Sequence, residues 1–336
     1  YTVIMKIIVI GSHGFIGSKI CSKLINSGHQ VFGIDDLSIY NSNKIDFYYF
    51  NQNLRQKIFL KDLKDFSRLN CNHSFEFEKI VNSFAPDIII NVAGTSIADV
   101  CKKNTQEAVE SIYSLNSNIL EVLKNKNIKK YIFFSSSMVY GNFSKEIISE
   151  DDETNPIDPY GAIKLGCEYL IKSFNQQFNL PYVIVRPSAV YGPTDANMRV
   201  SGIFIYNSFI NKPLKVMDKQ ERLDFTYVDD LANGINNIVS NDVTNEIFNL
   251  TTGNSKTIYE FASIIKSIKK NVIIESNAGE VEFMEGLKRP KRGTLNISKA
   301  REILNFKPAY DLEKGVQEYL DFMEENCLSY FEKYKK

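Results

Sequence analysis

An apolar strand that runs directly into a glycine turn constrains this chain more than any other feature. Residues 7–17 read IIVIGSHGFIG and are followed by a helical stretch and a second apolar strand. Gly11 permits a tight turn, Gly14 lets backbone amides approach a pyrophosphate at the helix N-terminus, and Gly17 lets the helix lie close to the sheet. The pattern predicts a dinucleotide-binding βαβ unit.

Two acidic residues at the end of the second strand indicate which dinucleotide binds. A carboxylate at this position accepts hydrogen bonds from the adenosine ribose hydroxyls and repels a 2′-phosphate. Asp35 and Asp36 both stand there, and the sequence leaves open which of them acts. The pair favours NAD over NADP as the cofactor; a solvated turn acid is the alternative interpretation.

Composition argues against polyanionic and membrane partners. Forty basic and forty acidic residues leave no net charge, so nothing suggests nucleic-acid binding. The longest apolar runs have strand length and are far too short to span a membrane. The five cysteines are scattered without a Cys-x-x-Cys pair, which fits a reducing cytosol and argues against zinc. We expect a cytoplasmic protein without a nucleic-acid, membrane or metal partner.

Short apolar runs alternate with helical stretches along the first half of the chain. This alternation predicts an α/β fold with a doubly wound parallel (Rossmann) sheet. After Pro187 the pattern loosens, so we expect a nucleotide-binding domain over residues 5–186, to which 222–254 return, and a smaller C-terminal substrate-binding lobe over 187–221 and 255–330. Substrate is expected between the two, at the carboxyl ends of the strands. The predicted strands are KIIVI, VFGID, KIFLKD, DIIINV, KYIFFSSS and YVIVRP.

Tyr160 and Lys164 are candidates for proton transfer. They lie four residues apart in a predicted helix and therefore share one face. A phenol with a pKa of about 10 is a poor base, but a nearby ammonium and a cationic nicotinamide favour the phenolate, which then takes a proton from a substrate hydroxyl. The same spacing at Tyr40 and Tyr310 shows that spacing alone carries little information. The position of Tyr160 after the strand KYIFFSSS favours the functional interpretation.

Three serines end that strand. A hydroxyl of Ser135, Ser136 or Ser137 can hold a reacting oxygen between the tyrosine and the nicotinamide. The alternative is that the serines only close the strand into a turn.

Six motifs in order resemble those of the extended short-chain dehydrogenase/reductases, specifically the NAD-dependent nucleotide-sugar epimerases and dehydratases. The resemblance extends over nearly the whole chain. The motifs are GSHGFIG, NVAG (91–94), SSSMVYG (135–141), YGAIK (160–164), VRPSAVYGP (185–193) and LDFTYVDDLANG (223–234).

The resemblance implies roles for individual residues. Ser136 corresponds to the catalytic Ser/Thr, Tyr160 to the base and Lys164 to the residue that clamps the ribose and tunes the tyrosine. Asp62 and Leu63 correspond to the adenine contacts. The implied cofactor contacts are completed by Gly11, Gly14, Phe15, Ile16, Gly17, Asp35, Asp36, Ala93, Tyr160 and Lys164.

Two positions separate the subgroups of this family. Dehydratases that resemble this chain carry an Asp-Glu pair directly after the catalytic threonine, where this chain has Ser137 and Met138. A methionine cannot transfer a proton, so water loss lacks its catalyst. The leading expectation is a UDP-glucose 4-epimerase-like enzyme that inverts C4 through a transient 4-keto sugar. A net 4-dehydrogenase or 4-ketoreductase and a catalytically idle NAD-binding sensor are the alternatives.

Two positions expected to bind the substrate diphosphate differ from the family pattern. Ala189 stands where relatives often have Asn, and Leu223 where they often have Arg. Neighbouring Arg222 is the candidate substitute, with Arg289 or Arg292 as a second guanidinium for bidentate phosphate binding. The expected contacts to a nucleotide-diphosphate sugar are Ser136, Ser137, Met138, Tyr160, Arg222 and Arg289.

We also expect a homodimer. Leu165, Tyr169 and Phe174 share a face of the helix that begins near Pro159, and relatives commonly dimerise through a four-helix contact there and at the helix near 104–125. The alternative is that these side chains belong to the core.

Overall fold

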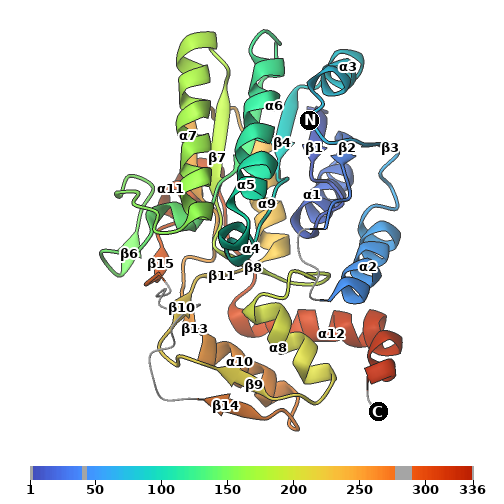
Figure 1. The fold of residues 1–336 in the computed structure, drawn as a ribbon, viewed down its shortest axis with the longest axis vertical. Coiled ribbons are helices and arrows are strands. Elements are labelled where there is room, and N and C mark those ends of the chain that lie inside the picture. The colour runs from blue at the N-terminus through green and yellow to red at the C-terminus, as the bar shows by residue number, and fades with distance from the viewer. Residues whose placement is uncertain (1–2, 40–43, 277–289, 335–336) are drawn as a thin grey trace.

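A parallel sheet forms the centre of the molecule. The computed structural model describes residues 3–39, 44–276 and 290–334, and within them the central sheet has seven strands in the order β12-β7-β5-β4-β1-β2-β3 (Figure 1). Every pairing in it is parallel, which confirms the predicted doubly wound fold. The strands are β1 (Lys6–Ile10), β2 (Gln30–Asp35), β3 (Asp65–Arg68), β4 (Ile88–Asn91), β5 (Lys130–Phe134), β7 (Tyr182–Arg186) and β12 (Glu246–Asn249).

Helices cover both faces of this sheet because its side chains alternate between two apolar cores. Ile7 and Val9 of β1 point to one core, and Ile8 and Ile10 point to the other. The first core includes residues of α1 (Phe15–Asn26), α9 (Val228–Val239) and α11 (Ser298–Leu304). The second includes residues of α3 (Ser74–Phe84), α4 (Ala98–Lys103), α5 (Thr105–Ala108), η2 (Val109–Ser114), α6 (Leu115–Leu123) and α7 (Pro159–Phe178).

A third core forms a lobe beyond the carboxyl ends of the strands, in the lower part of Figure 1. It is rich in aromatic side chains, and Phe47 from the first half of the chain packs into it with Tyr206 and Phe331. The lobe contains α8 (Val200–Phe209), α10 (Ile258–Ile268) and α12 (Leu312–Phe331), to which η4 (Glu332–Tyr334) is joined. The short strand pairs are β8 (Ala189–Tyr191) with β11 (Phe225–Tyr227), β9 (Leu214–Val216) with β14 (Ile274–Ser276), β10 (Arg222–Leu223) with β13 (Lys256–Thr257), and β6 (Ile147–Ile148) with β15 (Thr294–Leu295).

One predicted strand is wrong. The run KIFLKD (57–62) begins in the π-helical segment η1 (Arg55–Phe59), which continues helix α2 (Ile45–Leu54), and the true third strand begins at Asp65. A short apolar run fits either a strand or a helix. Tertiary contacts decide for the helix, because Phe59 lies under the Lys19 ammonium of α1 and stacks on Phe322 of α12.

No helix in the described part of the chain has both the length and the apolar character needed to cross a bilayer.

A buried ion pair ties α7 to the ends of two strands. Ser135, directly after β5, donates a hydrogen bond to Glu168 Oε1 at 2.5 Å. Arg186 at the end of β7 donates to both Glu168 oxygens, at 2.9 and 2.6 Å, and to the Tyr140 hydroxyl at 2.9 Å. Glu168 lies one helical turn beyond Lys164. The pair therefore sets the position of α7 relative to the serines that follow β5.

Replacing the buried carboxylate tests how much the fold depends on this pair. We expect Glu168→Gln to lower the free energy of unfolding by about 3–5 kcal/mol, because it leaves the Arg186 charge buried and uncompensated. Glu121→Gln is the matched control: its partner Lys124 is a surface residue, so the change costs about 0–1 kcal/mol. Urea denaturation measures both, and equal small losses would contradict the assignment.

Candidate functional site

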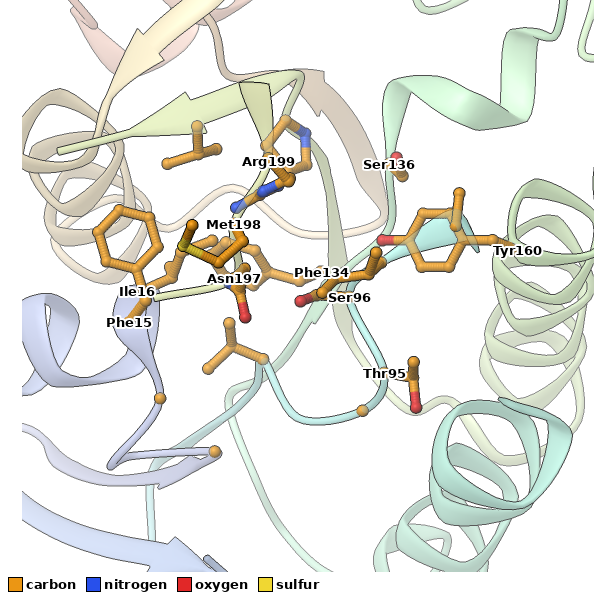
Figure 2. Close-up of a pocket in the computed structure, with 18 of the residues that line it drawn as sticks. Phe15, Ile16, Thr95, Ser96, Phe134, Ser136, Tyr160, Asn197, Met198 and Arg199 are labelled. Atoms are coloured by element: carbon orange, nitrogen blue, oxygen red, sulfur yellow. The ribbon is translucent and has the colours of Figure 1, made fainter. Parts of the chain in front are cut away.

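A cavity of about 920 Å³ lies where the strands of the central sheet end and the lobe begins. Its walls come from the glycine turn after β1, the segments after β4 and β5, the start of α7 and the start of α8. Figure 2 shows residues from these elements around one space, with Phe15 and Ile16 on one side and Tyr160 on the other. This is the edge of the sheet at which the sequence predicts a ligand.

The glycine turn leaves no room for side chains. Gly11 has a φ of +87°, and a Cβ placed there would lie 2.8 Å from the Ala93 nitrogen. A Cβ on Gly17 would lie 1.9 Å from the Gly11 carbonyl oxygen. Gly14 caps α1 without a side chain, so the N-terminus of the helix faces the cavity. A backbone cradle at a helix N-terminus fits the pyrophosphate of a dinucleotide.

Both candidate ribose acids line the cavity, and each is held in place. Asp35 accepts hydrogen bonds from the backbone nitrogens of His13 and Leu37, both at 2.8 Å. Asp36 accepts one from the Asn70 side chain at 2.9 Å. Burial raises the pKa of the Asp35 carboxyl, while the two backbone hydrogen bonds lower it. These bonds fix a carboxylate beside the glycine turn, where a ribose hydroxyl can be bound.

The implied adenine contacts Asp62 and Leu63 do not lie at the cavity. Both precede β3, Asp62 is exposed, and neither is among the described residues that line the cavity. The carboxyl end of a parallel strand faces the ligand edge of the sheet, so the residues that follow β3 are the ones placed at this edge. The expectation came from the wrong third strand, because β3 is mostly exposed and reads as an unremarkable polar run, DFSR. The residues that follow β3 and line the cavity are Leu69, Asn70, Cys71 and Asn72.

Tyr160 and Ser136 meet at the far wall. Asp158 caps α7 by accepting a hydrogen bond from the Gly161 nitrogen at 2.9 Å, which starts the helix at the point that puts Tyr160 in its first turn. The Tyr160 hydroxyl is hydrogen-bonded to the Ser136 side chain, and Figure 2 shows both residues at the same side of the cavity. Lys164 donates to the Phe134 carbonyl at 2.7 Å, with its ammonium 5.9 Å from the centre of the Tyr160 ring.

Burial opposes ionisation of both groups. It raises the pKa of Tyr160 to about 12, against the lowering effects of the Ser136 hydrogen bond and the Arg199 charge. It lowers the pKa of Lys164 to about 8. The phenol is therefore protonated at neutral pH in the protein alone. Further positive charge in the cavity would lower the pKa of Tyr160 towards neutrality.

The expected substrate contacts divide into those at the cavity and those elsewhere. Ser136, Ser137 and Met138 line it. Arg222 does not, because side chains alternate along β10: Leu223 lines the cavity, and Arg222 points away and donates to the Ser255 side chain and carbonyl at 3.1 and 2.5 Å. The remaining expected contact, Arg289, lies outside the described residues.

Other cationic side chains line the cavity from the lobe, from η1 and from α4. Arg199 at the start of α8 lies 3.8 Å from the Asp195 carboxylate, and Arg292, which the sequence had offered as an alternative, also lines the cavity. Sequence reasoning missed Arg199 because no motif contains it; its only signal is its place a few residues after VRPSAVYGP. The cationic side chains found at the cavity are Arg55, Lys102, Lys164, Arg199, Lys212, Lys215 and Arg292.

Comparison with known proteins agrees with this site. The model of the NAD-dependent epimerase/dehydratase family matches residues 7–251. A putative UDP-glucose 4-epimerase of Methanocaldococcus jannaschii is 31% identical, with 95% of this chain and 99% of that protein aligned, and a UDP-glucuronate 4-epimerase of Thermodesulfobacterium geofontis is 26% identical, with 95% and 96% aligned. The UDP-glucuronic acid 4-epimerase of Bacillus cereus, solved with UDP-glucuronic acid and NAD, has a TM-score of 0.83 at 26% identity, over 96% of this chain and 99% of that one.

These matches extend over most of the chain and include the motifs whose residues line the cavity. The protein belongs to the NAD-dependent epimerase/dehydratase family.

Proposed function

We propose that the protein is a nucleotide-sugar epimerase that inverts C4 of the sugar through a transient 4-keto sugar. The observation that carries this proposal is the hydrogen-bonded pair Tyr160 and Ser136, which shares one cavity with the glycine turn. Relatives named as UDP-glucose and UDP-glucuronate 4-epimerases support the reaction class. The experiments below test which nucleobase and which sugar the substrate carries and which stereocentre is inverted.

Three side chains at the reacting end of the cavity have distinct roles in this proposal. Bound NAD supplies reversible oxidation at a sugar carbon. Tyr160 takes the proton from the sugar hydroxyl and later returns it, and Ser136 holds the sugar oxygen by a hydrogen bond. Lys164 binds the nicotinamide ribose and adds positive charge beside the phenol.

The remaining residues hold the two nucleotides. Asp35 and Asp36 bind the adenosine ribose, Ala93 lies along the dinucleotide, and Arg199 and Arg292 bind the substrate diphosphate in place of Arg222. The turn residues that hold the NAD pyrophosphate are Gly11, Gly14, Phe15, Ile16 and Gly17.

Removing the phenol hydroxyl tests the proton transfer. We expect Tyr160→Phe to keep its NAD but to lose about 10²–10⁴-fold in rate, because a positioned acid or base contributes that much. Turnover is followed by NMR with a panel of UDP-, GDP- and dTDP-sugars. Tyr169→Phe, on the exposed side of the same helix, is the control and keeps the parent rate. A Tyr160→Phe enzyme within tenfold of the parent would place the base elsewhere.

Product mass tests the absence of dehydration. Elimination of water needs a proton donor and a base next to the leaving hydroxyl, whereas Ser137 offers a hydroxyl 3.4 Å from the Ser188 hydroxyl and Met138 offers a thioether. We expect product and substrate of equal mass. Mass spectrometry that finds a product lighter by one water refutes this, and a difference of two hydrogens identifies a net oxidoreductase.

We further propose a homodimer built on α7. Tyr169 is 61% exposed on this helix, and Phe178 and Val109 are further exposed apolar side chains on α7 and η2. Phe174, by contrast, packs partly into the core. We expect light scattering at micromolar concentration to give twice the chain mass, and Tyr169→Glu to shift it towards one chain. A parent protein of single-chain mass would contradict the proposal.

A further inference from the structure

One buried arginine joins the cofactor turn to the lobe. Arg55, at the start of η1, is only 2% exposed. Its Nη1 donates to the His13 carbonyl at 2.9 Å, and its Nη2 donates to the Thr194 carbonyl at 3.2 Å. His13 belongs to the glycine turn, and Thr194 belongs to the loop that leads from β8 to α8, residues 192–199. A single guanidinium thus holds two segments that are far apart in the sequence.

This loop is a wall of the cavity. Asn197, Met198 and Arg199 line it, and Figure 2 draws them at the same space as Phe15 and Ile16 of α1.

The loop also needs external support to keep its shape. Thr194 and Met198 have φ values of +69° and +53°, in the left-handed region that side chains disfavour, most of all a β-branched one. Such a conformation persists only where surrounding contacts hold it. The hydrogen bond from Arg55 to the Thr194 carbonyl is one of those contacts.

The surroundings of Arg55 fit an anionic ligand in the cavity. Burial lowers the pKa of its guanidinium, and Tyr48 and the carboxylates of Asp195 and Asp35 raise it. Arg55 lines the cavity, and its buried Nε has no hydrogen-bond partner among the described residues. The Asp195 carboxylate also lies 3.8 Å from Arg199, so two arginines lie near this one carboxylate. A dinucleotide pyrophosphate is the anion that a turn of this kind receives.

We propose that Arg55 is a positioning residue that retains NAD. It fastens the 192–199 loop to the glycine turn, so the dinucleotide leaves only after the contacts to the His13 and Thr194 carbonyls break. His13 is held from both sides, since its nitrogen donates to Asp35 at 2.8 Å while its carbonyl accepts from Arg55. This role concerns the cofactor and is independent of which sugar nucleotide the enzyme uses.

The test measures NAD release directly. Parent, Arg55→Gln and Arg55→Lys proteins are purified in buffer without NAD, bound nucleotide is released with acid and quantified by chromatography, and the dissociation rate is measured by displacement with a fluorescent NAD analogue. We expect dissociation at least tenfold faster in Arg55→Gln. Arg55→Lys should be intermediate, because an ammonium keeps the charge but loses the planar fork. Lys57→Gln, an exposed cation two residues along η1, is the matched control and releases NAD at the parent rate.

A second readout separates this role from a purely structural one. With added NAD, the Arg55→Lys enzyme should show a KM for NAD that rises by more than its kcat falls, and a melting temperature that approaches the parent value at saturating NAD. Parent-like NAD release in Arg55→Lys overturns the proposal. So does a loss of kcat at saturating NAD with unchanged release. If Arg55→Gln does not fold, the lysine variant decides the matter.

Discussion

The close approach of helix α1 to the glycine turn is the constraint on which the rest of the site depends. The position of a Gly17 Cβ is occupied by the Gly11 carbonyl, 1.9 Å away, so any side chain would push the helix from the sheet. With the helix seated, its N-terminus opens onto the cavity, and its partial positive charge is available to an anion. The His13 peptide then lies between Asp35 and Arg55. His13 thereby links the glycine turn to Asp35 and, through Arg55, to the lobe.

Without a bound ligand, the protein itself favours the neutral forms of the two central groups of the site. Burial raises the pKa of Tyr160 to about 12 and lowers that of Lys164 to about 8, so both groups are biased towards their neutral forms. The nearby pair Glu168 and Arg186 is also buried, but its two charges neutralise each other and serve to hold α7. A ligand that brings positive charge next to the phenol therefore lowers the pKa of Tyr160, the group proposed to transfer the proton. This couples occupancy of the cofactor site to the basicity of Tyr160.

The structure places Asp62, Leu63 and Arg222 away from the cavity, for reasons that a single sequence does not reveal. Asp62 and Leu63 were assigned from a strand that is in fact helical, and the helix is stabilised by contacts of Phe59 with α1 and α12 that are remote in sequence. Arg222 has the right charge at the right place in the motif, but strand alternation points it away from the cavity and Leu223 towards it. Arg55 and Arg199 belong to no motif and reach the cavity only through the packing of the lobe against the sheet.

By itself the sequence determined the parallel sheet, the cofactor turn and the Tyr160–Lys164 face, because these follow from periodicities and glycine positions within a few residues of one another. The spacing of residues on one helix and the order of strand and turn are local properties. They can therefore be predicted without knowledge of the remainder of the chain. Only the tertiary structure decided which cations meet at the cavity and how the lobe is fastened to the turn. Those contacts join residues such as His13, Arg55 and Thr194, which are brought together by the packing of three separate cores rather than by any local pattern.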